Sequence, residues 1–156
     1  PSAGPVVMIS WDDYFMTLAF MASGRSTCPR RSVGAVLEQN RRVRGTGYNG
    51  APSGVTSCLD DDCLMREGSC IRTIHAEANL MLQTDSRERE GAAVYCTDRP
   101  CWACANLLAN SGVSEIVYCR GYHRDLEEVE KIMSETGIVF RSVAYPPGIE
   151  VIEPTV

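Results

Sequence analysis

The chain has 156 residues, of which 44% are hydrophobic, and its formal net charge at pH 7 is −5. This composition suits one globular domain over residues 1–156, with a core at about 10–142. The acidic balance argues against stable nucleic-acid binding, because phosphate neutralisation supplies most non-specific affinity. No apolar stretch approaches the ~20 residues of a membrane span, and the chain start does not read as a signal peptide. We therefore expect a cytoplasmic protein that acts on small molecules.

The first part of the chain predicts a helix followed by a hairpin. Ser10 is a candidate helix cap, with Asp13 at the capping-box position. Apolar residues then recur at helical spacing and predict one buried stripe, formed by Trp11, Tyr14, Leu18 and Met21. Val33–Glu38 and Arg42–Tyr48 read as two strands joined at Gln39 and Asn40.

The second part of the chain alternates helices and strands. The expected elements are a helix from about His75, a charged connection at Asp85–Gly91, a strand at Ala92–Thr97, a helix at Trp102–Ser111, a strand at Glu115–Cys119, a helix at Asp125–Thr136 and a strand at Ile138–Ser142. Gly137 suits the cap of the last helix. This order predicts an α/β fold in which helices cover both faces of a sheet. The tail 143–156, with Pro146, Pro147 and Pro154, is expected to be extended and to pack on a neighbour.

The most informative motif joins His-Ala-Glu at 75–77 to Pro-Cys-Trp-Ala-Cys at 100–104. A catalytic zinc takes three protein ligands and keeps its fourth position for water, and His75, Cys101 and Cys104 make three. Both halves are expected to begin helices, whose positive N-terminal ends favour thiolates. His75 and Glu77 would diverge in mid-helix, so both can reach one centre only if that centre lies beyond the first turn.

Glu77 is interpreted as a proton carrier rather than a fourth ligand. Zinc lowers the pKa of its bound water to about 7, and a neighbouring carboxylate can pass that proton to a ring nitrogen and a leaving amine. The combination of His-x-Glu with Pro-Cys-x-x-Cys is typical of zinc nucleobase deaminases. A lone Cys-x-x-Cys is as often a structural zinc knuckle or a redox pair, but the combined motif, preceded by a predicted strand, favours catalysis.

With these motifs the chain resembles the zinc-dependent cytidine and deoxycytidylate deaminases, and within them the deoxycytidylate (dCMP) deaminases. The resemblance spans about residues 10–141. Besides the zinc motif it rests on Arg-Ser-Thr-Cys-Pro at 25–29, Val-Gly-Ala at 33–35, Gly-Tyr-Asn-Gly at 47–50 with Pro52 and Gly54, Tyr-Cys-Thr at 95–97 and Ser-Gly-Val at 111–113. It implies a three-layer α/β/α cytidine-deaminase-like fold with a central five-stranded mixed sheet, and hydrolytic deamination of dCMP to dUMP and ammonia.

The resemblance also implies roles for individual residues. His75, Cys101 and Cys104 would hold the catalytic zinc, Glu77 would be the general acid/base, Asn49 would contact the sugar, the Ala76 backbone would meet the pyrimidine carbonyl, and Tyr122 would lie beside the base. Alternatively, Asn49 only serves a turn and Tyr122 only packs. Arginine holds phosphate by bidentate bonds, so Arg25, Arg30 and Arg31 are candidates for the 5′-phosphate, with a solvated cluster as the alternative.

Four further cysteines predict a second metal site. Three of them lie in the irregular segment 50–73, which by its length should be functional or stapled. Four thiolates would make a closed structural zinc site, formed by Cys28, Cys58, Cys63 and Cys70. In the resemblance, Cys28 and Cys58 match ligand positions of a second zinc, whereas Cys63 and Cys70 have no counterpart. Disulfides and free thiols are the alternatives. Cys96 and Cys119 are expected to be buried core thiols.

The resemblance leaves assembly and substrate choice as expectations. It implies a homo-oligomer, with a hexamer favoured, and names dCTP and dTTP as candidate effectors. Rival functions are deamination of another cytosine or modified-cytosine nucleotide, deamination of a base in single-stranded nucleic acid, and a non-catalytic zinc-stabilised binding module. The acidic charge and the Gly-Tyr-Asn-Gly element speak against a polymer substrate.

Overall fold

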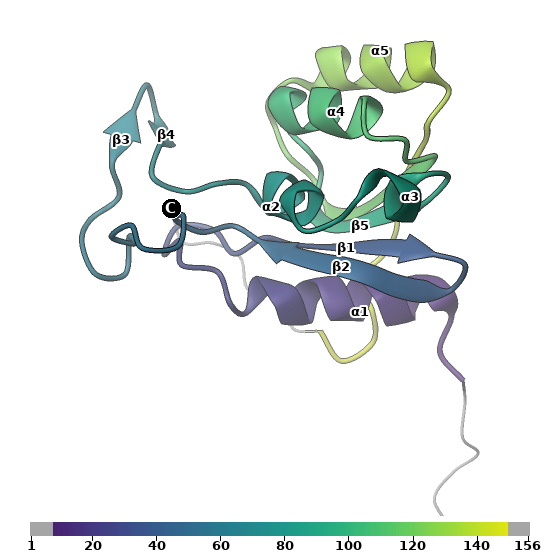
Figure 1. Ribbon diagram of the computed structural model, residues 1–156, viewed down its shortest axis with the longest axis horizontal. Helices are drawn as coiled ribbons and strands as arrows, with labels where there is room; N and C mark the ends of the chain where they lie inside the picture. Colours follow the sequence, from purple (N-terminus) through teal and green to yellow (C-terminus); the bar gives the residue numbers. More distant parts are fainter. Residues whose placement is uncertain (1–7, 150–156) are drawn as a thin grey trace, which may run out of the picture.

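The computed structural model describes residues 8–149 and is built on a five-stranded sheet (Figure 1). Its strands are β1 (Gly34–Gln39), β2 (Arg42–Tyr48), β5 (Ala93–Asp98), β6 (Glu115–Arg120) and β7 (Val139–Ser142). They lie in the order β2-β1-β5-β6-β7. β1 pairs antiparallel with β2 and with β5, whereas β5 with β6 and β6 with β7 are parallel pairs. The predicted five-stranded mixed sheet is confirmed.

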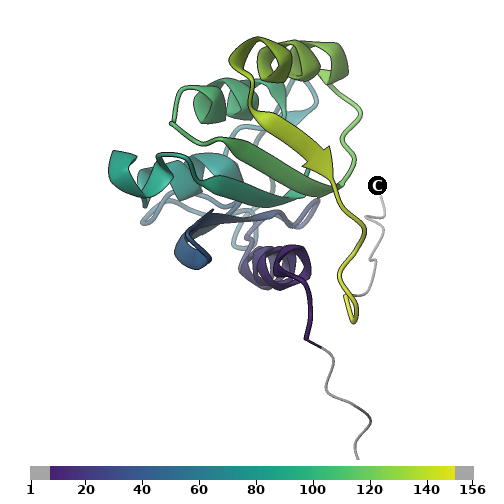
Figure 2. The ribbon, with the colours of Figure 1, turned by 90° about the vertical axis from the view of Figure 1, so that its right-hand side faces the viewer.

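Helices cover both faces of this sheet (Figures 1 and 2). α1 (Trp11–Ser23) covers one face, and α2 (Ala76–Leu82), α4 (Trp102–Ala109) and α5 (Leu126–Thr136) lie over the other. Successive strand residues face opposite sides, so Val36 packs toward α1 and Leu37 toward the three-helix layer. Each face thus has its own apolar core, and the expected α/β/α layering is confirmed.

The first helix begins as predicted but buries a different face. The Ser10 hydroxyl oxygen accepts a hydrogen bond from the Asp13 amide at 3.0 Å and caps α1. The buried residues are Phe15, Met16, Ala19 and Ser23, whereas Trp11, Tyr14 and Met21 of the predicted stripe are exposed and Leu18 is half-buried. The stripe was therefore wrong. Apolar and aromatic side chains lie on two adjacent faces of α1. The face that carries the small Ala19 packs on the sheet, because there the helix backbone can approach Gly34 closely.

Two glycines allow helices to lie directly on the strands. A Cβ at Gly34 would lie 1.9 Å from the carbonyl oxygen of Ala19, and one at Gly47 would lie 2.4 Å from that of Ala76. Any larger residue at either position would force the helix away from the sheet. Gly47 therefore fixes the height of the start of α2 above β2.

The charged connection at 85–91 contains the short helix α3 (Ser86–Arg89). The Asp85 carboxylate accepts from the Glu88 amide at 2.9 Å, and the Glu88 carboxylate accepts from the Asp85 amide at 3.0 Å. This is a reciprocal capping box. Its Asp-x-x-Glu spacing is visible in the sequence, so the helix was missed although a signal for it exists.

The segment predicted to be irregular carries a small hairpin, β3 (Met65–Arg66) paired with β4 (Ser69–Cys70). Its turn residues Glu67 and Gly68 have φ values of 49° and 80°, a left-handed pair that suits a two-residue hairpin turn. In Figure 1 the hairpin stands apart from the main sheet, beyond the start of α2.

The described part of the tail packs back on the chain itself. Val143 packs against the core beneath α1, and the Tyr145 ring lies 5.8 Å from the Phe20 ring. The rest of the tail, including Pro154, lies outside the described residues. Cys96 is fully buried as expected, whereas Cys119 is only half-buried. None of the helices within residues 8–149 has the length and apolar character of a membrane span.

Candidate active site

The site forms where two helices start. His75 is the N-cap of α2 and Cys101 is the N-cap of α4, and both have extended backbones, with ψ of 152° and 172°. His75 therefore does not follow the helical rotation that would separate it from Glu77. This satisfies the geometric requirement set by the sequence, because the histidine lies just before the first turn and the glutamate within it.

The three predicted ligand atoms meet at distances suited to zinc. The Nδ1 atom of His75 lies 3.3 Å from the Cys104 Sγ atom and 3.5 Å from the Cys101 Sγ atom, and all three atoms lie within 4.8 Å of one another. Tetrahedral zinc with Zn–S near 2.3 Å and Zn–N near 2.0 Å requires N···S separations of about 3.5 Å. The donor set therefore fits a zinc ion with one position left for a further ligand.

These side chains are also electrically coupled. Hydrogen bonding with Cys104 and His75 lowers the pKa of the Cys101 thiol to about 4, so this sulfur is a thiolate at neutral pH. The hydrogen bond with Cys101 raises the pKa of His75. The contact with Cys101, together with burial, raises the pKa of Cys104. A metal cation ionises a coordinating thiol, which would make Cys104 an anionic ligand as well.

Glu77 lies in the first turn of α2 and is only 4% exposed. Burial raises the pKa of its carboxyl group, while the nearby His75 opposes that change. The carboxyl group also lies within hydrogen-bonding reach of Cys104. A carboxyl group with a raised pKa beside a metal donor set is suited to taking up and releasing a proton near neutral pH.

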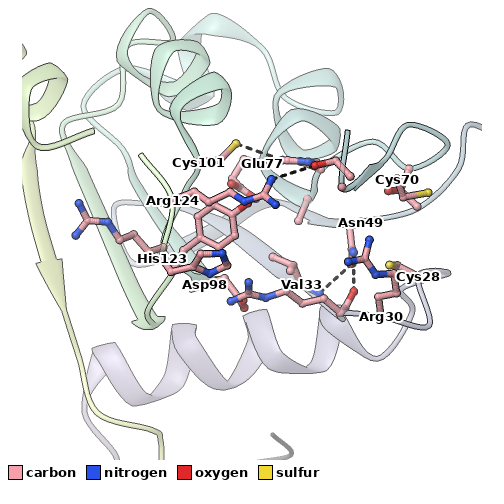
Figure 3. Close-up of a pocket in the computed structure, with 18 of the residues that line it drawn as sticks. Cys28, Arg30, Val33, Asn49, Cys70, Glu77, Asp98, Cys101, His123 and Arg124 are labelled. Carbon is pink, nitrogen blue, oxygen red and sulfur yellow. Dashed lines mark hydrogen bonds and ion pairs between the residues drawn. The ribbon is translucent and has the colours of Figure 1, made fainter. Parts of the chain in front are cut away.

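The donor set opens into a cavity of about 510 Å³ (Figure 3), a volume typical of small-molecule sites. The predicted substrate contacts Asn49, Ala76 and Tyr122 line it, as do Arg30, Arg31 and Cys28. Arg25 does not line it; its backbone belongs to the turn that ends α1, where its amide donates to the Ala22 carbonyl oxygen at 3.0 Å.

Asn49 is 8% exposed and holds two neighbouring segments together. Its Nδ2 atom donates to the Arg31 carbonyl oxygen at 2.7 Å, and its Oδ1 atom accepts from the Val33 amide at 2.9 Å (Figure 3). An asparagine amide has two N–H donors and two acceptor lone pairs. One of each remains after these bonds, so Asn49 can contact a ligand in the cavity while bracing its wall.

A buried carboxylate organises one part of the cavity wall. Asp98, 4% exposed at the end of β5, accepts from Nε and Nη2 of Arg120 at 3.0 and 2.7 Å. It also forms an ion pair with Arg31. The Arg31 guanidinium lies 5.2 Å from the centre of the Tyr122 ring and donates to the Gly121 carbonyl oxygen. Asp98 thus holds the arginine against which Tyr122 rests.

Comparison with known proteins agrees with this geometry. The model of the cytidine and deoxycytidylate deaminase zinc-binding region matches residues 9–120. The chain belongs to the cytidine and deoxycytidylate deaminase family. It is similar to the deoxycytidylate deaminase of Mycobacterium phage D29, at 43% identity over 69% of this chain and 93% of that protein. It is also similar to the Saccharomyces cerevisiae deoxycytidylate deaminase, at 38% identity over 90% of this chain but only 47% of the yeast protein.

A solved structure shares the fold. The dCMP deaminase of cyanophage S-TIM5, crystallised with dCMP and dUMP, superposes with a TM-score of 0.70 at 26% identity. The match covers 84% of this chain and 95% of the phage protein. This likeness agrees with the sheet order and helix layers described above.

As a family member, the chain has the expected zinc-binding region. A second group of thiols lies at the same cavity, because its member Cys70 lines it. The sulfur atoms of Cys58, Cys63 and Cys70 all lie within 4.8 Å of one another, and those of Cys58 and Cys70 are 3.6 Å apart. Tetrahedral zinc thiolate sites place sulfur atoms about 3.8 Å apart, so the group suits a structural zinc. Cys28 is not part of this group and instead lines the cavity together with Cys70. Its role as fourth ligand stays a prediction.

Several cavity residues of this deaminase were not identified from the sequence. They are Asp98, Arg99, His123 and Arg124. Asp98 and Arg99 immediately precede the Pro-Cys-x-x-Cys motif, so their place beside the site could have been inferred. His123 and Arg124 lie in the loop between β6 and α5 and belong to no motif that would have revealed them.

Proposed function

We propose that this chain catalyses the hydrolytic deamination of dCMP to dUMP and ammonia. The observation that carries the proposal is the meeting of His75, Cys101 and Cys104 beside the buried Glu77 in one cavity of nucleotide size. The D29 and yeast relatives, both named deoxycytidylate deaminases, and the phage structure with dCMP and dUMP support this substrate. We take residues 10–142 to be a single catalytic domain.

In this mechanism each residue has one task. When bound by His75, Cys101 and Cys104, zinc supplies Lewis acidity that lowers the pKa of water to about 7. Glu77 accepts a proton from the water molecule that attacks C4 of the cytosine. It delivers that proton to N3, where it remains. It then takes the second proton from the new hydroxyl group on C4 and passes it to the departing amine, so that the C4–N bond breaks, the C4 carbonyl forms, and water and dCMP become dUMP and ammonia. Burial keeps Glu77 away from bulk solvent during both transfers.

The remaining expected contacts orient the base and the sugar. The free amide N–H and lone pair of Asn49 face the sugar, and the backbone of Ala76 meets the pyrimidine carbonyl group at the start of α2. Tyr122, resting against Arg31, forms the wall beside the ring. These roles are supported by the position of all three residues in the cavity lining.

The decisive experiment is turnover of dCMP, CMP, 5-substituted dCMP, deoxycytidine and single-stranded DNA by the purified protein and by Glu77→Gln. We expect fast release of ammonia from dCMP by the native protein, and a loss of at least a hundredfold in the variant with zinc content unchanged. Near-native turnover by Glu77→Gln would remove Glu77 from the mechanism. Absence of ammonia release from every substrate would favour the zinc-stabilised binding module instead.

We also infer that the chain works as a homo-oligomer, with a hexamer favoured, in the cytoplasm. The outer face of α4 supports assembly, because Trp102 and Leu107 are 51% and 42% exposed there and Leu82 of the adjoining α2 is 76% exposed. All eight cysteines are free thiols, as expected in a reducing compartment. Sedimentation analysis tests the assembly, and turnover with added dCTP or dTTP tests whether these nucleotides are effectors.

A further inference from the structure

The loop 121–125 joins β6 to α5 and forms part of the cavity wall. Three of its residues line the cavity, and two of these are labelled in Figure 3: Tyr122, His123 and Arg124. Asp125 ends the loop and is half-buried. The place of the Tyr122 ring in the cavity therefore depends on what holds this loop.

The backbone of Asp125 has an uncommon conformation. Its φ is 59° and its ψ is 28°, in the left-handed region, which costs stability for a residue that has a Cβ atom. The other non-glycine residues with positive φ within 8–149 lie in two-residue hairpin turns: Asn40, Arg41 and Glu67. Such turns require that conformation. No hairpin turn requires it at Asp125, so another interaction of this residue must offset the cost.

The side chain of Asp125 serves a neighbouring helix instead of its own. Asp125 is the N-cap of α5, but it makes no side-chain cap bond there. Asp85, the N-cap of α3, shows the usual arrangement: its φ is −103° and its carboxylate accepts from the Glu88 amide. The Asp125 carboxylate accepts instead from the Trp102 amide, at 3.1 Å. Trp102 is the first residue of α4, so the loop is tied to the start of that helix.

The start of α4 needs a cap from outside. A helix leaves its first four N–H groups without an internal partner, and Cys101, the N-cap of α4, makes no side-chain cap bond. Its sulfur atom belongs to the donor set of the candidate zinc site. A carboxylate is also favourable near the positive N-terminal end of a helix. Asp125 therefore supplies the cap that Cys101 does not provide.

We propose that Asp125 is a positioning residue, which fastens the loop 121–125 to the start of α4 and thereby holds Tyr122 in place beside the donor set. This inference rests on the proposed function, and it names the group that fixes the wall beside the base relative to the metal ligands. Asp125 acts only through the loop. Its loss should therefore affect binding of the base more than the chemical step.

Two substitutions at this position separate the hydrogen bond from the backbone conformation. Asp125→Gly removes the carboxylate, and glycine adopts the left-handed backbone without strain, so a defect in this variant cannot come from strain. Asp125→Asn keeps a side-chain oxygen that can accept from the Trp102 amide, and asparagine also tolerates this backbone. The control is Asn40→Gly, which makes the same backbone change at an exposed hairpin turn outside the cavity.

The measurements use the zinc-loaded protein, and circular dichroism and zinc content verify that each variant is folded and loaded. They are kcat and KM for dCMP, the calorimetric affinity for dUMP, and hydrogen–deuterium exchange at the Trp102 amide. In Asp125→Gly we expect the KM for dCMP to rise, the affinity for dUMP to fall and the Trp102 amide to exchange faster, each by about fivefold, the effect of one hydrogen bond. The kcat value should change by less than about twofold, because Cys104, Ala105 and Leu108 keep α4 packed in the core.

Every value for Asp125→Asn and Asn40→Gly should stay within about twofold of the native protein, because both keep an acceptor for the Trp102 amide. In a Tyr122→Ala background, Asp125→Gly should weaken dUMP binding by less than about twofold further, because two residues that act through one contact are not additive.

Four results would overturn the assignment: native-like KM and dUMP affinity in Asp125→Gly, native-like exchange at Trp102 in that variant, an equal loss in Asp125→Asn, or a full further loss in the Tyr122→Ala background. Failure of the native protein to deaminate dCMP would instead refute the proposed function. The exchange at Trp102 needs no substrate and would still decide whether Asp125 fastens the loop to α4.

Discussion

Removal of the Asp98 carboxylate should lower the free energy of unfolding, because this group binds two arginines of the cavity wall. In Asp98→Ala, Arg31 and Arg120 lose a common counter-ion whose side chain is 6% exposed. Breaking a fully buried ion pair costs about 3–5 kcal/mol. The two arginine side chains are 31% and 20% exposed, so solvent screening reduces this to about 2–3 kcal/mol. For a chain of this size the melting temperature should fall by roughly 5–10 °C.

The assay is urea and thermal unfolding at fixed zinc and protein concentration, since ligands and assembly shift apparent stability. Asp98→Asn should lose less than the alanine variant, because its remaining oxygen can still accept from Arg120. The control is Glu135→Gln, which breaks a surface pair of 3.9 Å with Lys131 and should cost less than about 0.5 kcal/mol. A loss below about 1 kcal/mol in Asp98→Ala, or equal losses in Asp98→Ala and Glu135→Gln, would refute the reasoning.

Three further perturbations have definite expected outcomes. Gly47→Ala places a methyl group 2.4 Å from the Ala76 carbonyl oxygen. The free energy of unfolding should therefore fall by about 1–3 kcal/mol, and kcat should fall because the start of α2 shifts. An unchanged kcat would contradict this. Hydrogen bonds from Arg141 lower the pKa of Asp12. The stability that ionised Asp12 contributes is therefore complete above its unfolded pKa of about 3.9 and is lost as the pH falls through its lower folded pKa. The difference in unfolding free energy between the native protein and Asp12→Asn should accordingly shrink on acidification. A difference independent of pH would contradict this. Cys63→Ser should reduce zinc from two ions per chain toward one and raise the KM for dCMP through the hairpin; unchanged metal content would exclude Cys63 as a ligand.

The sequence predicts the parts of this molecule that depend on local pattern. The Ser10 cap, the alternation of strands and helices, and the helix starts at His75 and Cys101 all follow from residues a few positions apart, and the structure confirms them. The chemistry of the donor set is local in the same sense, because each half of the motif is contiguous. The combined motif also predicts that the two halves meet in one site, and the structure places their three donor atoms within 4.8 Å of one another.

What the sequence does not predict depends on contacts between distant segments. Arg31, Asp98 and Arg120 form one network although they are widely separated along the chain. The buried face of α1 was mispredicted because periodicity cannot choose between adjacent apolar faces, and the choice is made by close approach to Gly34. Arg124 lies in a loop with no motif, so its place in the cavity follows only from the path of β6 and α5.

The catalytic donor set and the outer part of the cavity wall are built on different kinds of structure in this chain. The donor set and Glu77 lie at the starts of helices packed directly on the sheet, a rigid frame that suits a geometry with little tolerance. One wall of the cavity is instead formed by a hairpin of four strand residues, whose Cys70 belongs to the second thiol group. A hairpin this small cannot be stable alone, so metal binding at that group would be what holds this wall of the cavity in place. On this argument, loss of the second metal should impair recognition of the nucleotide while leaving the catalytic donor set intact.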